Sequence, residues 1–149
     1  MKKLGLSLVA VLALVQFSLA AEGNWLTDFE KAQTLAKEQK KLVFIDFTGS
    51  DWCPPCKALH KNVLTSKEFV DYAKDNLVLL VVDFPNRNKP PIEVQKANEA
   101  LAKKFNVEGF PTILVLDANG KQLMREVGYQ GENGKDYVAK LKRIKGKTS

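Results

Sequence analysis

The feature that most constrains this chain is a pair of cysteines, Cys53 and Cys56, set between a strand-forming run and a helix. The run covers residues 42–47 and is almost continuously apolar, which predicts a strand buried on both faces. The two cysteines are the only ones in the 149 residues. A Cys-x-x-Cys pair at the start of a helix can alternate between dithiol and disulfide. The sequence therefore predicts redox chemistry at this junction.

The position of the pair assigns a different role to each sulfur. Cys53 stands where the helix is predicted to begin, and unpaired backbone N–H groups and the helix dipole favour thiolate over thiol there. The thiolate is the attacking species. Cys56 lies one turn inside the helix and can resolve a mixed disulfide that Cys53 forms. A purely structural bridge is the weaker interpretation, because so short a loop constrains the unfolded chain little.

The start of the chain has the pattern of a secretory signal peptide. A basic end precedes a mainly apolar run over residues 4–19, which closes with a small-x-small cleavage site ending at Ala20. The run is shorter than the roughly twenty residues that a membrane span needs, so cleavage is expected rather than an uncleaved anchor. The sequence thus predicts a signal peptide at 1–20, a mature domain at 21–149, and a periplasmic or secreted protein.

The charge of the chain gives a weaker signal. Its formal net charge is +6 at pH 7, with many of the basic residues near the C-terminus. Such a cluster could form a nucleic-acid patch. A solvated last helix is the preferred interpretation, because cations suit the negative C-terminal end of a helix and exported proteins rarely meet nucleic acid. No nucleic-acid partner is therefore expected.

The rest of the chain predicts helices and strands in alternation. A capping box at Thr27-Asp28-Phe29-Glu30 is expected to start the first helix, and Ser66 could cap a short helix after the cysteines. Further elements are expected at 77–82 (strand), 85–91 (loop), 94–105 (helix), 113–116 and 121–127 (strands) and 137–144 (helix). Strands that alternate with helices imply right-handed crossovers and a sheet covered on both faces.

Two motifs within this pattern resemble the thioredoxin superfamily, and the resemblance spans about residues 28–144. The segment from Trp52 through Cys56 to Lys57 looks like the redox motif of the family, and Gly109-Phe110-Pro111-Thr112 looks like its cis-proline loop. The leader and the segment 46–52 bring the chain near to exported members, among them the C-terminal domain of the membrane reductase DsbD. The resemblance implies an α/β thioredoxin fold, with a central mixed β-sheet covered by helices on both faces.

The resemblance also implies roles for residues of the site. Cys53 would be the exposed nucleophile and Cys56 the resolving thiol. Pro111, in the cis form, would lie against the sulfurs and leave the backbone before it free to pair with an extended peptide. The residues expected to contact a substrate are Trp52, Pro54, Pro55 and Phe110.

Asp46 matches the buried aspartate of the family, which relays a proton to the resolving cysteine. It stands seven residues before Cys53, where the common pattern has six, so Asp51 is a rival carboxylate. Leu79 is expected at the place where many members carry a lysine paired with this aspartate. Without such a cation, a buried Asp46 should have a raised pKa.

The residues between the cysteines predict the direction of electron flow. Pro54 and Pro55 remove two N–H groups that could stabilise a Cys53 thiolate, and only the amide of Cys56 remains. A less stabilised thiolate makes a better electron donor. The sequence therefore predicts a thiol–disulfide oxidoreductase that reduces disulfides or relays electrons, with no cofactor beyond its own disulfide.

Expected partners are disulfide-containing exported proteins and, from the resemblance, a membrane electron donor of the DsbD or CcdA type. A monomer is expected.

A metal site is the alternative from another class. Cys53, Cys56 and His60 could offer three ligands for zinc or copper. No residue supplies an obvious fourth ligand, and Lys57 excludes the Cys-x-x-Cys-His pattern of haem attachment. Redox chemistry is therefore preferred. The loop at 85–91 is where partner choice is expected to reside, because loops carry such functions.

Overall fold

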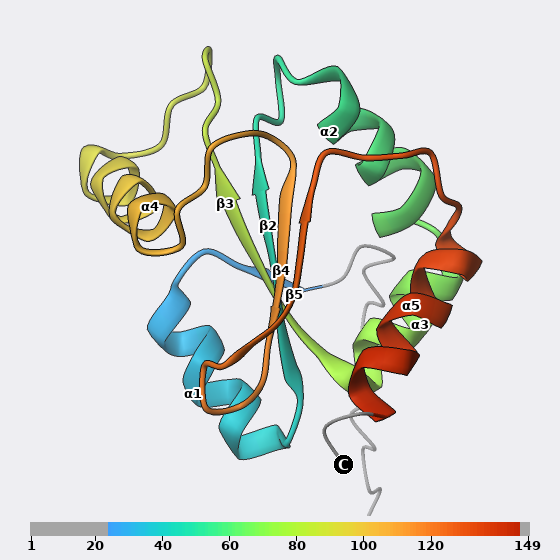
Figure 1. Ribbon diagram of the computed structural model, residues 1–149. Coiled ribbons are helices and arrows are strands. Elements are labelled where there is room, and N and C mark those ends of the chain that lie inside the picture. Colours follow the sequence, from blue (N-terminus) through green and yellow to red (C-terminus); the bar gives the residue numbers. More distant parts are fainter. Residues whose placement is uncertain (1–23, 147–149) are drawn as a thin grey trace, which may run out of the picture.

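The computed structural model describes residues 24–146 and contains a five-stranded sheet with helices on both faces (Figure 1). The strands are β1 Trp25–Leu26, β2 Leu42–Thr48, β3 Leu77–Asp83, β4 Thr112–Leu116 and β5 Gln122–Val127. The helices are α1 Phe29–Gln39, α2 Pro54–Leu59, the π-helix η1 His60–Leu64, α3 Lys67–Asn76, α4 Ile92–Lys104 and α5 Gly134–Gly146. The predicted leader at 1–20 lies outside the described residues. Within residues 24–146, none of the helices has the length and hydropathy that a membrane span requires.

The sheet is mixed, as predicted. Its strand order is β1-β3-β2-β4-β5, in which β1, β3 and β2 run parallel and β4 and β5 run antiparallel to their neighbours. All seven residues of β2 are buried, which confirms a central strand covered on both faces. The carboxyl ends of β2 and β3 therefore meet at one edge of the sheet (Figure 1). Residues 49–52, which lead from β2 to Cys53, begin there and are called the redox loop below.

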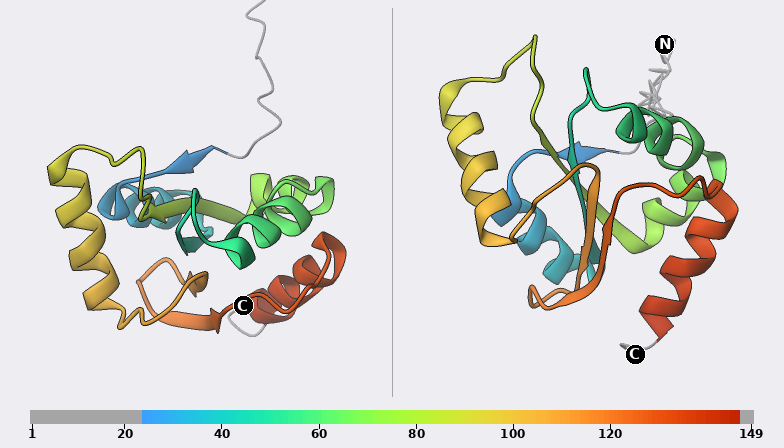
Figure 2. Two further views of the ribbon diagram at one scale, coloured as in Figure 1. Left: turned by 90° about the horizontal axis from the view of Figure 1, so that it is seen from above. Right: turned by 45° about the horizontal axis from the view of Figure 1, so that its top comes forward.

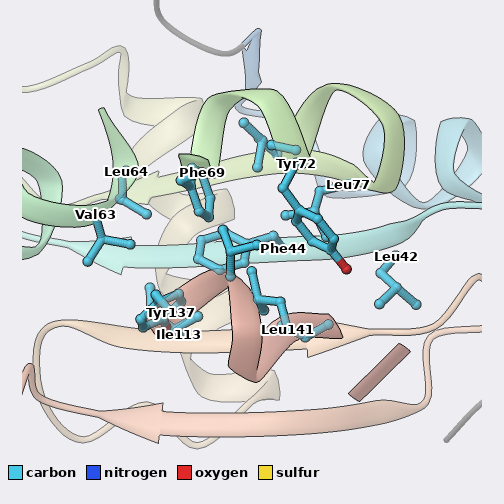
Figure 3. Close-up of a cluster of buried hydrophobic side chains, with 14 of the residues drawn as sticks. Leu42, Phe44, Val63, Leu64, Phe69, Tyr72, Leu77, Ile113, Tyr137 and Leu141 are labelled. Atoms are coloured by element: carbon cyan, nitrogen blue, oxygen red, sulfur yellow. The ribbon is translucent and has the colours of Figure 1, made fainter. Parts of the chain in front are cut away.

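Alternation along β2 divides the core into two layers. Phe44 points into the layer under α2, α3 and α5, where its ring packs edge-on against Phe69 at 5.2 Å between centroids (Figure 3). Ile45 and Phe47 point the other way, into the layer that packs against α1 and α4. Asp46 is two residues from Phe44 and therefore lies on the α2 side of the sheet. Figure 2 shows the sheet between these two groups of helices.

Three local features differ from the sequence prediction. Asp28, and not Thr27, caps α1, because its carboxylate accepts a hydrogen bond from the Lys31 N–H at 3.0 Å. Ser66 caps α3 as predicted and accepts from the Phe69 N–H. The strand β1 was missed, because two residues are too few to show a period. The helix after the cysteines continues as the π-helix η1, a form that the apolar spacing does not distinguish from α.

Candidate active site

The two cysteines form a disulfide at the predicted strand–helix junction. Cys53 and Cys56 are bonded to each other, with 5.3 Å between their Cα atoms. The chain leaves β2, turns through Gly49, and brings the Cys53 N–H to the Gly49 carbonyl at 2.9 Å. Cys53 is then the N-cap of α2, with Pro54 and Pro55 in the first turn, where a proline costs no helical hydrogen bond. The local sequence thus accounts for the position of both sulfurs.

The expectation of an exposed Cys53 is wrong for this oxidised form. Cys53 is 3% exposed and Cys56 is 4% exposed. The neighbouring residues make the accessible surface instead, since Pro54 and Pro55 are exposed and Trp52 is 42% exposed. The surface around the disulfide is therefore made by Trp52 and the two prolines.

An aromatic cluster joins the redox loop to the proline loop. The Trp52 ring packs edge-on against Phe110 at 5.8 Å between centroids, and Phe110 contacts Phe84 at 5.3 Å. The Trp52 Nε1–H donates to the Phe84 carbonyl at 2.8 Å. The Phe110–Pro111 peptide bond is cis, as predicted. We call Trp52, Phe84 and Phe110 the aromatic wall. The sequence prediction of the site included Trp52 and Phe110 but not Phe84.

A glycine in the redox loop is required by the aromatic wall. A Cβ on Gly49 would lie 2.4 Å from Trp52 Cε2, so Gly49→Ala must displace the indole from Phe84 and Phe110. We expect a loss of about 1–3 kcal/mol of unfolding free energy, measured by urea unfolding. Gly109→Ala is the matched control, because its Cβ would meet Val127 at an ordinary 3.7 Å. Equal stability of the two variants would contradict this account.

Asp46 is buried behind the disulfide, as predicted. Asp46 is 6% exposed, and within residues 24–146 its Oδ1 atom has no hydrogen-bond partner. Burial, and secondly the charge of Asp83, raise the pKa of Asp46 from 3.8 to about 7. Asp46 and Cys56 line the same cavity of about 370 Å³. The raised pKa and the shared cavity allow the carboxyl to exchange a proton with Cys56 near neutral pH.

Two other expectations around Asp46 need correction. The register of β2 and β3 pairs Asp46 with Val81 and pairs Leu79 with Phe44, so Val81 rather than Leu79 stands beside the carboxyl. Val81 carries no charge, so the inference of a missing cation at this place is unchanged. Asp51 lies in the loop outside the sheet, and the carboxyl of Asp51 is not the buried one.

Asp51 instead fastens the loop at 85–91. Its carboxylate accepts the N–H groups of Asn86 and Arg87 at 2.9 and 2.8 Å, and these bonds hold the pKa of this solvent-facing carboxyl below its ordinary value. A carboxyl that favours its charged form in this way is poorly suited to hold a proton near neutral pH. The loop that sequence analysis linked to partner choice is therefore tied directly to the redox loop.

Asp83 is the functional candidate that sequence reasoning missed. It ends β3, and its carboxylate accepts the Ser50 N–H at 3.0 Å and the Ser50 Oγ–H at 2.5 Å. It lines the cavity that also contains Asp46. Its position at the end of a buried strand, next to the strand that leads to the cysteines, was the signal that could have found it.

The structure gives no support to the metal alternative. Within residues 24–146, no group of three or more His, Cys, Asp and Glu side chains could hold a metal ion. Cys53 and Cys56 are bonded to each other, and His60 lines the cavity with Cys56 but completes no such group. The trio Cys53, Cys56 and His60 is therefore not assembled as a ligand set.

The fold and the redox pair place this chain among the thiol–disulfide oxidoreductases. A comparison with known protein families identifies the family within this class. Residues 29–145 match the model of the thioredoxin-like domain, and the chain belongs to this family.

Named relatives carry the same assignment. The chain is 37% identical over 123 residues to the disulfide bond reductase DsbH of Chlamydia pneumoniae. The aligned residues make up 83% of this chain and 73% of DsbH. A solved structure of a DsbH oxidoreductase superposes with a TM-score of 0.75 at 35% identity, over 88% of this chain and 91% of that one. The thiol:disulfide interchange protein DsbD of Actinobacillus pleuropneumoniae is 37% identical over 102 residues, which are 64% of this chain and 16% of DsbD.

Proposed function

We propose that this protein is an exported disulfide reductase or electron relay, with Cys53 as the nucleophile. The reduced Cys53 thiolate attacks one sulfur of a substrate disulfide, forming a mixed disulfide and releasing the other substrate sulfur as a thiolate. Cys56 gives its proton to the Asp46 carboxylate and attacks the Cys53 sulfur. The Cys53–Cys56 bond forms, the second substrate thiolate leaves, and two electrons have passed to the substrate.

The observation that carries the reducing direction is the hydrogen bonding of the Cys53 sulfur. The Cys56 N–H points to the Cys53 Sγ at 3.3 Å, and Pro54 and Pro55 have no N–H to offer. A thiolate that accepts few hydrogen bonds is weakly stabilised, so the reduced form gives up electrons readily. The disulfide bond reductase DsbH, which is 37% identical over 83% of the chain, supports the same direction.

The reduction potential tests this direction. We expect a value near the about −270 mV of thioredoxin and well below the about −120 mV of DsbA. The measurement is equilibration with dithiothreitol or glutathione, followed by quantification of the free thiols. Pro55→His is a useful second variant, since it adds an N–H and an imidazole between the cysteines and should raise the potential. A potential near that of DsbA in the unaltered protein would overturn the reducing assignment.

The remaining parts of the proposal concern location and partners. A leader cleaved after Ala20 would place the domain at 21–149 in the periplasm or outside the cell, where a reductant needs resupply. We propose a membrane donor of the DsbD or CcdA type for that resupply, and disulfide-containing exported proteins as substrates. Trp52, Pro54, Pro55 and Phe110 would contact them, with Pro111 beside the exchanging sulfurs. No cofactor beyond the disulfide is proposed, and a monomer suffices for the chemistry.

A further inference from the structure

Two carboxylates share the cavity behind the disulfide. In the parallel pairing of β2 and β3, Asp46 lies opposite Val81 and Thr48 lies opposite Asp83. Residues two apart in a strand point to the same face, so Asp46 and Asp83 face the same side of the sheet. Both line the cavity of about 370 Å³, together with Cys56. The group that exchanges a proton with Cys56 therefore has an acidic neighbour.

Within residues 24–146, few other charged groups lie around Asp46. Lys57 of α2 and His60 of η1 line the same cavity from the helix side, and both side chains are exposed. Tyr137 of α5 is close enough for the charge of Asp46 to help raise the tyrosine pKa. From the sheet, Val81 and Ile113 pair with Asp46 and carry no charge. The charge of Asp83 raises the pKa of Asp46, and among the causes of that shift only burial is larger.

Asp83 also holds the start of the redox loop. Its carboxylate accepts two hydrogen bonds from Ser50. The next two residues of the redox loop, Asp51 and Trp52, also bind the segment 83–87. Asp51 binds the Asn86 and Arg87 N–H groups, and Trp52 donates to the Phe84 carbonyl. The segments 50–52 and 83–87 are thus joined residue by residue, at the sheet edge that Figure 2 brings forward. One carboxylate therefore contacts both the loop before Cys53 and the cavity of Asp46.

We propose that Asp83 is a positioning residue for thiol–disulfide exchange, whose negative charge makes the Asp46 carboxylate a stronger acceptor of the Cys56 proton while its bonds to Ser50 fix the loop before Cys53. Two like charges that line one cavity repel, so ionisation of Asp46 costs more while Asp83 is charged. When Asp46 takes the proton of Cys56, the cavity keeps one negative carboxylate instead of two. This inference rests on the proposed exchange of a proton between Asp46 and Cys56.

The test is the titration of the Asp46 carboxyl, followed by carbon-13 NMR in the oxidised protein. In Asp83→Asn, which keeps the shape and removes the charge, the midpoint should fall by on the order of one pH unit. Asp83→Glu should restore it, because the charge returns. Ser50→Ala removes one hydrogen bond without removing the charge, so its midpoint should stay near that of the unaltered protein. An unchanged or raised midpoint in Asp83→Asn would overturn the inference.

Two further readouts keep the outcomes distinct. Asp83→Ser is a second variant without the charge, and the Asp46 midpoint should fall in it as well, which keeps the inference testable even if Asp83→Asn does not fold. The pH profile for resolution of a mixed disulfide by Cys56 should move to lower pH in Asp83→Asn. A profile that responds to Asp46→Asn but not to Asp83→Asn refutes only this inference. A profile that Asp46→Asn leaves unchanged refutes the proposed proton exchange itself.

Discussion

Replacing Cys56 with alanine is expected to turn the protein into a trap that stays joined to its substrate through Cys53. Cys56 is the sulfur that breaks the mixed disulfide, and in the structure it is already bonded to Cys53. Without it, release depends on an external thiol, and turnover should fall by at least on the order of 10³-fold. The measurement is the amount of covalent complex on non-reducing gels after incubation with an exported disulfide protein, alongside an insulin reduction assay.

The matched control is the other cysteine. Cys53→Ala should lose activity to the same extent and accumulate no complex, because Cys56 stands inside α2 and lacks the N-cap position that favours a thiolate at Cys53. Complexes of equal amount in both variants would show that the two sulfurs are equivalent, which contradicts the assigned roles. Mass spectrometry of the captured chain would identify the substrate and the cysteine that reacts.

The second large effect is on stability, and it arises from the burial of Asp46. The pKa of Asp46 is raised from 3.8 to about 7 in the fold, so between these values the folded state holds a proton that the unfolded state has lost. The free energy of unfolding therefore decreases as pH rises through this window, by about 4 kcal/mol in all. Asp46→Asn removes this loss. The variant should be more stable than the unaltered protein above pH 7, by up to about 4 kcal/mol.

Urea unfolding of the oxidised protein at several pH values tests this expectation. The advantage of Asp46→Asn should shrink as pH falls from 7 to below 3.8, because Asp46 then becomes neutral in both states. Asp51→Asn is the control of opposite sign: backbone N–H groups hold the pKa of Asp51 low, so its contribution is present at neutral pH and lost in acid. A stability difference for Asp46→Asn that does not depend on pH would show that the carboxyl is not buried as described.

The strands β2, β3 and β4 were predictable because each is a short, mainly apolar run with clear borders. The observed ends of β2, β3 and β4 fall within one residue of the predicted ends. Strands buried on both faces consist mainly of apolar residues, so the change to polar residues marks where each strand ends. The redox pair and the proline loop were predictable for another reason, namely that each is a compact motif. Their approach through Trp52 and Phe110 follows from the fold that the two motifs indicate.

The parts that sequence missed depend on long-range register and loop contacts. Leu79 and Val81 point to the same face of β3, so counting along the chain does not fix which of them stands beside Asp46. The bonds of Asp51 and Asp83 join residues 33 to 36 positions apart, and no local pattern reports such contacts. The covered state of Cys53 likewise arises only when the surrounding loops are packed.

The residue-by-residue connection between 50–52 and 83–87 has a consequence for redesign of this protein. A transplanted loop that follows a different backbone path over 84–87 would misplace the carbonyl that Trp52 binds and the N–H groups that Asp51 binds, and the indole would lose its anchor. Exchange of specificity should therefore succeed only when both segments are moved as one cassette. Libraries that randomise either segment alone would mostly sample damaged sites, whereas paired libraries would sample new recognition surfaces.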